Sequence, residues 1–181
     1  PQILQEADKM KKILVVVDMQ NDFIDGALGT KEAEAIVENV IRKIKGYKDD
    51  YIFATRDTHP ENYLETQEGK NLPVPHCIKG SDGWGLRDEL KPLLESKKCF
   101  EKLTFGSVDL ANYLKENASE ISAIEVCGLV SNICVVSNAV IAKAACPEAE
   151  IIVDSSLTAS FAPDLHQATL DVLKGIQVTV L

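Results

Sequence analysis

The sequence lacks several features that would assign it to a special class of protein. Its 5 cysteines are odd in number and form no CxxC pair, which favours free thiols in a reducing cytoplasm over a disulfide framework. No apolar run approaches the roughly 20 residues of a membrane span, and Pro1–Lys12 has no apolar core of a secretory signal. The 19 basic residues are outnumbered by 28 acidic ones. We therefore expect neither a nucleic-acid nor a membrane partner.

Repeats, low-complexity tracts and long linkers are also missing from the 181 residues. Hydrophobic residues make up 45% of the chain, a fraction typical of globular proteins. The length suits one domain. We expect that domain to cover residues 1–181, with residues 1–11 as an N-terminal extension.

Short apolar runs alternate with helical patterns along the chain. Continuously apolar runs are typical of strands buried on both faces. They predict strands at Ile13–Val17, Tyr51–Thr55, Ile124–Gly128, Ile151–Asp154 and Gln177–Leu181. Helical spacing predicts helices at Glu32–Lys45, Val108–Lys115, Asn132–Ala145 and Pro163–Lys174. The expected fold is an α/β sandwich with a mostly parallel central sheet, in which ligands lie beyond the carboxyl ends of the strands.

Residues 56–102 interrupt this alternation with a long, proline-containing stretch. Long irregular segments inside a compact domain are usually either functional or disordered. This one contains two of the three histidines, His59 and His76. We therefore expect it to form an active-site and metal-binding loop region.

Three residues near the ends of short runs are candidates for chemistry. Asp18 follows the first predicted strand, where an aspartate also often caps a turn. Cys134 lies near the start of a predicted helix, where the helix dipole favours a thiolate, although most free cysteines are buried structural residues. Lys102 ends the run Lys98–Lys102. A lysine is usually a solvated surface residue, but one held between a carboxylate and a thiol stabilises the thiolate.

Asp57, His59 and His76 offer the ligands of a metal site. An aspartate and a histidine two positions apart on an extended segment point the same way, and a second histidine completes an N/O site suited to Zn²⁺, Fe²⁺ or Mn²⁺. Hydrogen bonding alone is the other interpretation. His166 lies among polar neighbours on the last predicted helix, and we expect it at the surface.

Taken together, these segments resemble the isochorismatase-like cysteine hydrolases, and among them the nicotinamidases. The resemblance covers residues 12–181 and rests on V-D-M-Q-N-D-F at 17–23, T-R-D-T-H at 55–59, P-V-P-H-C-I-K-G at 73–80, E-K at 101–102 and G-L-V-S-N-I-C-V at 128–135. Each motif is short, but their joint occurrence in this order is specific.

The resemblance implies a three-layer α/β fold and a catalytic triad of Asp18, Lys102 and Cys134. In such a triad Cys134 is the nucleophile, Asp18 moves the proton and Lys102 balances the charge. A cis peptide before the nucleophile maps to Val130–Ser131, and the N–H groups of Val130 and Cys134 would face the substrate oxygen.

The resemblance also implies a metal site beside the triad, which holds the pyridine nitrogen of the substrate. Its ligands map to Asp57, His59 and His76, with Glu65 as the fourth and Glu68 as the alternative. Phe23 and Phe105 are expected in the substrate pocket, and zinc is the expected metal, with Fe²⁺ or Mn²⁺ as alternatives.

The expected activity is hydrolysis of a small carboxamide, most simply nicotinamide in NAD salvage, by a cytoplasmic homo-oligomer. A metal-independent relative that acts on a vinyl ether, ureido or other amide substrate is the alternative. A redox module that uses Cys134 as a reactive thiol, and a catalytically silent scaffold, belong to other classes.

Overall fold

The computed structural model describes residues 10–181. Most of the predicted N-terminal extension therefore lies outside the described residues, and Lys11 already belongs to the first strand. No helix in the described part is both long enough and apolar enough to cross a bilayer.

A single parallel sheet forms the centre of the molecule. Within residues 10–181 its strands are β1 (Lys11–Val17), β2 (Ile52–Asp57), β3 (Lys98–Lys102), β4 (Ile121–Leu129), β5 (Glu150–Val153), β6 (Thr158–Ala159) and β7 (Thr179–Val180). The spatial order is β3-β2-β1-β4-β5-β7, and β6 pairs with the end of β4. This order places β1 and β4, which lead to Asp18 and Cys134, side by side.

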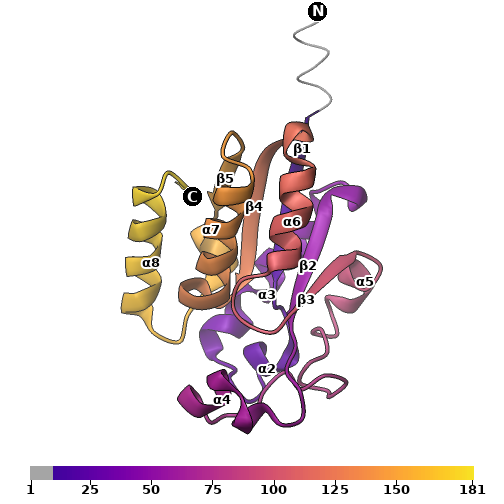
Figure 1. Ribbon diagram of the computed structural model, residues 1–181, viewed down its shortest axis with the longest axis vertical. Helices are drawn as coiled ribbons and strands as arrows, with labels where there is room; N and C mark the ends of the chain where they lie inside the picture. The colour runs from indigo at the N-terminus through magenta and orange to yellow at the C-terminus, as the bar shows by residue number, and fades with distance from the viewer. Residues whose placement is uncertain (1–9) are drawn as a thin grey trace, which may run out of the picture.

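Helices cover both faces of the sheet, as Figure 1 shows with α6 and α7 in front and α3 behind. They are α2 (Asn21–Ile24), α3 (Lys31–Lys45), α4 (Gln67–Asn71), α5 (Lys91–Leu94), α6 (Val108–Glu116), α7 (Val136–Ala145) and α8 (Pro163–Gly175). The predicted three-layer α/β fold is therefore confirmed.

Successive side chains of β1 belong alternately to the two hydrophobic cores, one on each face of the sheet. Val15 and Val17 pack with α6, α7 and α8, whereas Leu14 and Val16 pack with α3. Because successive side chains of a strand point to opposite faces, a strand covered on both sides must be apolar throughout. This explains why the run Ile13–Val17 predicted its strand.

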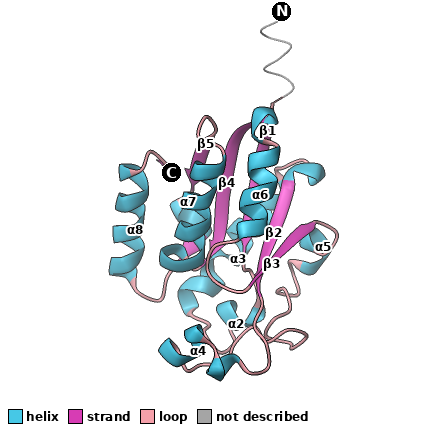
Figure 2. Cartoon of the chain, viewed as in Figure 1, coloured by secondary structure: helices cyan, strands magenta, loops and turns pink. Residues whose placement is uncertain are grey.

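Loops gather at the carboxyl ends of the strands, where α2 and α4 also lie (Figure 2). The chain between β2 and β3 holds only short helices and turns, among them the 3₁₀ turn Tyr63–Glu65. The predicted loop region at 56–102 thus lies where the strands end, as the site requires.

Candidate active site

Asp18 stands at the end of β1 in a left-handed conformation, with φ of 48°. Aspartate is one of the few residues that adopt this conformation readily. Its N–H donates to the carbonyl of Thr55 at 3.2 Å, and its Oδ1 accepts from Thr55 Oγ1 at 2.7 Å. The side chain is fully buried. Both contacts hold the second carboxylate oxygen, Oδ2, toward the end of β3.

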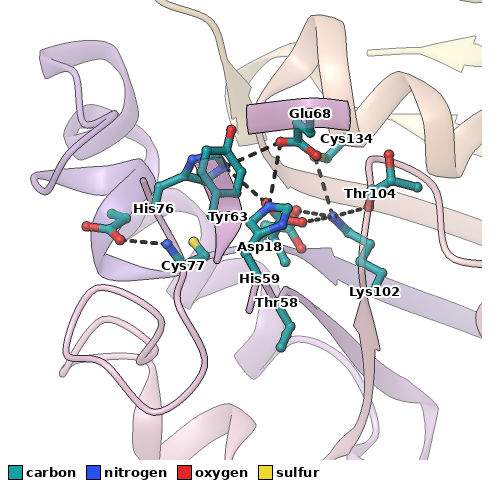
Figure 3. Close-up of polar contacts among 12 residues, drawn as sticks. Asp18, Thr58, His59, Tyr63, Glu68, His76, Cys77, Lys102, Thr104 and Cys134 are labelled. Carbon is teal, nitrogen blue, oxygen red and sulfur yellow. Dashed lines mark hydrogen bonds and ion pairs between the residues drawn. The ribbon is translucent and has the colours of Figure 1, made fainter. Parts of the chain in front are cut away.

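Lys102 ends β3 and places its ammonium between Asp18 and Cys134 (Figure 3). Nζ lies 2.6 Å from Asp18 Oδ2 and 3.5 Å from Cys134 Sγ. It also donates to the carbonyl of Thr104 at 3.1 Å. The lysine is only 4% exposed. The structure thus brings together the three residues to which the sequence assigned the chemistry.

Cys134 lies in a π-helical turn, Ser131–Val135, that precedes α7. The predicted helix over 132–145 is therefore divided into a wider turn and an α-helix. The cis peptide is Leu129–Val130, so its prediction at Val130–Ser131 was wrong by one residue. The motif does place the bond just before the turn, but sequence alone did not fix which of two neighbouring peptides it is.

Burial and charge set the protonation of the triad. Burial raises the pKa of Asp18, and the nearby ammonium of Lys102 opposes that rise. Burial and the Asp18 charge raise the pKa of the Cys134 thiol. Burial would lower the pKa of Lys102, but the charge of Asp18 raises it above its usual range. Burial thus favours the protonated forms of Asp18 and Cys134, and the charged lysine between them stabilises a negative charge on either one.

Four further side chains form a group with the geometry of a metal site. Asp57, His59, Glu68 and His76 each offer one ligand atom, and these atoms lie within 4.8 Å of one another. Asp57 Oδ2 is 2.9 Å from His59 Nε2 and 3.4 Å from His76 Nε2. His76 Nδ1 lies 2.8 Å from the carbonyl of Val74. If this Nδ1 carries the proton, Nε2 is free to bind a metal.

Glu68, and not Glu65, completes this group. Glu65 is exposed and accepts from Asn62. Glu68 lies on the next helix, α4, with Oε1 at 3.6 Å from both His59 Nε2 and His76 Nε2. Glu65 therefore does not belong to this group, and the member of the group is Glu68, the alternative that the sequence left open.

The donor set fits a divalent metal. Two imidazoles and two carboxylates are ligands that zinc and related metals accept. Asp57 Oδ2 is the oxygen that faces both histidines, whereas Oδ1, which has no hydrogen-bond partner among the described residues, lies 3.6 Å from the Lys102 ammonium. Burial disfavours ionised Asp57, but hydrogen bonds from His59 and His76 lower its pKa below the usual range.

Gln20, Tyr63 and Asn138 support the site, and the sequence analysis missed all three. Gln20 clamps the backbone of Asp57, donating to its carbonyl and accepting from its N–H, both at 2.8 Å. Tyr63 is fully buried edge-on against the rings of His59 and His76. Gln20 belongs to the motif at 17–23, so its position was a usable signal.

Asn138 connects the turn that carries Cys134 to the loop after β3. It donates to the carbonyls of Cys134 and Phe105 and accepts from the N–H of Ser107. All three of these hydrogen bonds are internal, and the side chain is fully buried. Its only sequence signal was a polar residue in an otherwise apolar helix.

A cavity of about 900 Å³ borders the group of four ligands; Thr104 and Ile133, which are close to the triad, also line it, whereas the three triad side chains do not. Its polar end includes His59 and Glu68, and its apolar wall includes Leu72, Phe105 and Ile133. Phe105 lies in the pocket as predicted. Phe23 does not line this cavity; it is buried edge-on against His76, with ring centroids 5.6 Å apart, so its predicted place in the pocket wall was wrong.

The remaining cysteines and the third histidine have other surroundings. Cys77, Cys127 and Cys146 are buried, and Cys99 is exposed. His166, expected at the surface, is half-buried and lies 2.9 Å from the hydroxyl of Ser131. That expectation was wrong because the contact joins two residues far apart in the chain.

Comparison with known proteins agrees with this geometry. The family model of the isochorismatase domain matches residues 12–181. An isochorismatase family protein of Bacillus subtilis, PncA, is 31% identical over 171 residues, which cover 87% of this chain and 91% of that protein.

Solved structures give the same result. The nicotinamidase/pyrazinamidase PncA from Bacillus subtilis is similar with a TM-score of 0.82 and 27% identity, over 94% of this chain and 99% of that one. The pyrazinamidase of Pyrococcus horikoshii in complex with zinc has a TM-score of 0.80 and 27% identity, over 94% and 98% of the two chains. The chain therefore belongs to the isochorismatase family.

Proposed function

We propose that the chain hydrolyses nicotinamide to nicotinate and ammonia through a thioester on Cys134. One observation supports this most directly: Asp57 belongs to both groups. Its Oδ2 contacts His59 and His76, and its Oδ1 lies 3.6 Å from the Lys102 ammonium. A substrate whose ring nitrogen faces the four ligands therefore has its carboxamide near the triad.

The first half of the reaction forms the thioester. Asp18 takes the thiol proton, and the sulfur of Cys134 forms a bond to the carboxamide carbon. The N–H groups of Val130 and Cys134 hold the oxyanion, each such donor typically contributing about 3–4 kcal/mol. The C–N bond then breaks as Asp18 gives its proton to the departing nitrogen, which leaves as ammonia.

The second half regenerates the thiol. Asp18 takes a proton from a water molecule as the oxygen attacks the thioester carbon. The C–S bond breaks, the sulfur regains the proton from Asp18, and the acid leaves. Lys102 keeps its positive charge throughout. It balances the negative charge that Asp18 or the sulfur carries in this buried site.

The four ligands would hold a divalent metal ion, and we propose that this ion is zinc. When bound, such an ion supplies a Lewis acid that takes the pyridine nitrogen as a ligand. Asp57, His59, Glu68 and His76 would provide its protein ligands, and Tyr63 packs against both histidine rings to fix their orientation.

The test is ammonia release from a panel of amides by zinc-loaded and chelator-treated protein. We expect nicotinamide and pyrazinamide to be cleaved faster than aliphatic amides, and chelation to remove most of the activity until zinc is restored. Cleavage of a ureido or vinyl ether substrate that does not respond to chelation would instead establish the metal-independent alternative. Localisation in the cytoplasm and homo-oligomer formation remain predictions.

A further inference from the structure

His166 reaches the nucleophile turn from a helix that is otherwise remote from the site. It lies in the first turns of α8, and its Nδ1 is 2.9 Å from Ser131 Oγ. Ser131 is 1% exposed. A buried hydroxyl needs a hydrogen-bond partner, and this imidazole supplies one.

Ser131 is the first residue of the turn that carries Cys134. The carbonyl of Val130 accepts from the N–H groups of Ile133 and Val135, each at 3.1 Å. No side chain of the described residues caps the start of the turn. The Ser131 hydroxyl is directed to α8.

The approach of α8 is fixed by the sheet. Thr158 and Ala159 of β6 pair with Gly128 and Leu129, the last residues of β4. Only three residues separate β6 from the start of α8 at Pro163. Burial lowers the pKa of His166, so near neutral pH the ring is uncharged and has one donor and one acceptor nitrogen.

We propose that His166 is a positioning residue that holds the nucleophile turn through Ser131. It keeps Cys134 Sγ at its 3.5 Å distance from Lys102 Nζ without itself touching the substrate. This inference rests on the proposed function, since it assumes that Cys134 does the chemistry. A small displacement of a reacting group lowers kcat strongly. KM should change little, because the cavity wall that binds substrate belongs mostly to other elements.

Three variants distinguish a positioning role of His166 from a role in merely filling space. His166→Leu removes the hydrogen bond and replaces the ring with an apolar side chain of similar size. We expect kcat to fall about tenfold, the effect of about 1.4 kcal/mol, with little change in KM. His166→Asn offers a polar atom near the place of Nδ1 and should restore most of kcat. Gln167→Ala, on the exposed face of the same helix, is the matched control and should behave as wild type.

Alkylation by iodoacetamide, followed at each cysteine by mass spectrometry, tests the inference without any substrate. We expect slower alkylation of Cys134 in His166→Leu, because a thiolate displaced from Lys102 is less stabilised. Alkylation of the buried Cys127 and Cys146 should not change. This readout remains valid if wild-type protein cleaves no nicotinamide, a result that would refute only the proposed function.

Several results would overturn the inference. One is His166→Leu with wild-type kcat and wild-type alkylation of Cys134. Another is equal loss of activity in His166→Leu and His166→Asn. Faster alkylation of Cys134, Cys127 and Cys146 alike would show that the histidine only stabilises the fold. Ser131→Ala combined with His166→Leu should lower kcat no further than the larger single effect, and additive losses would contradict a shared contact.

Discussion

A single ammonium group, the Nζ of Lys102, balances the charge at the centre of the site. It faces the carboxylates of Asp18 and Asp57 and the sulfur of Cys134. A buried lysine is stable only with such partners. Because the lysine stays charged, it stabilises a negative charge on either Asp18 or the sulfur, which is the arrangement that a thiol nucleophile with a carboxylate base requires.

The nucleophile is tested by Cys134→Ala. We expect ammonia release to fall by about four orders of magnitude or more, because the covalent route is lost, while nicotinamide still binds. Ammonia release and calorimetric binding are the measurements. Cys99→Ala, which changes an exposed cysteine away from the triad, is the control. Retained hydrolysis in Cys134→Ala would refute the assignment.

The pH dependence tests Asp18 as the base. Only the ionised carboxylate accepts the thiol proton, and burial raises its pKa above the ordinary value of 3.8. The rate should therefore fall as the pH falls through this raised pKa, at a higher pH than for an exposed aspartate. The profile of kcat/KM against pH measures this acidic limb.

Asp18→Asn is the matching variant. It should lower kcat by about 10²–10⁴-fold, the usual contribution of a general base, and remove the acidic limb. An unchanged limb in the residual activity of Asp18→Asn would assign the titration to another group.

Residues differ in how far the sequence predicted them. Asp18 and Cys134 could be found because Asp18 directly follows β1 and Cys134 lies in the turn after β4, and parallel strands end at one edge of the sheet. His166 could not, because its partner Ser131 is 35 positions away. Glu65 and Glu68 could not be separated by type, since both are glutamates of one loop region.

At the level of elements, α4 decides which glutamate faces the histidines. Thr66 caps this helix by accepting from the N–H of Gly69, and it also donates to the carbonyl of Tyr63. Gly69 packs so closely that a Cβ would lie 2.0 Å from the Tyr63 carbonyl oxygen. This packing turns Glu68 inward and leaves Glu65 on the outer side of the preceding turn.

Zinc binding distinguishes the two glutamates. We expect Glu68→Ala to weaken zinc binding at least about tenfold, the effect usual for loss of a group that supports a metal site. Glu65→Ala should bind zinc as wild type does. Competition with a chromophoric chelator gives both affinities. Equal affinities in Glu68→Ala and wild type would exclude Glu68 as a ligand.

His59→Ala tests the site as a whole. It removes a buried imidazole from the centre of the four ligands, so elemental analysis should find little zinc in the purified protein. Unchanged zinc content would refute the site.

The close pairing of β1 and β4 at the end of both strands depends on Gly128. Its φ is +110°, and a Cβ there would lie 2.1 Å from the carbonyl oxygen of Val17. We expect Gly128→Ala to lower the free energy of unfolding by about 3 kcal/mol, from overlap and backbone strain together. Denaturant unfolding measures the change.

Gly175→Ala is the control for that substitution. Gly175 ends α8 with nothing within 4 Å of an added Cβ, so its free energy of unfolding should stay close to that of wild type. A similar loss in both variants would contradict the argument from close approach.

The sequence did not predict β3 and β6, because neither strand has an apolar run long enough to be recognised. β3 is an edge strand with mostly exposed side chains, so it lacks the apolar run that marked the other strands. β6 has two residues, too few for any periodicity. The buried strands β1, β2 and β4 were predictable because both of their faces must be apolar.

At the scale of the whole molecule, the site assembles from both halves of the chain. The first half supplies Asp18 and the four candidate metal ligands, and the second half supplies Cys134. The sheet order, with β1 between β2 and β4, brings these parts together, and Asp57 contacts both His76 and Lys102. This contact between the two groups is why a ring-bearing amide, anchored at one end and cleaved at the other, is the substrate that we propose.

In the proposed reaction an acyl group of the substrate is carried on the sulfur of Cys134. Rapid acid quench of zinc-loaded protein during turnover of nicotinamide, followed by peptide mass spectrometry, detects this intermediate. We expect a nicotinoyl adduct on the peptide that contains Cys134, lost again once the substrate is exhausted. Steady release of ammonia with no adduct on this peptide, or with an adduct on another cysteine, would contradict it.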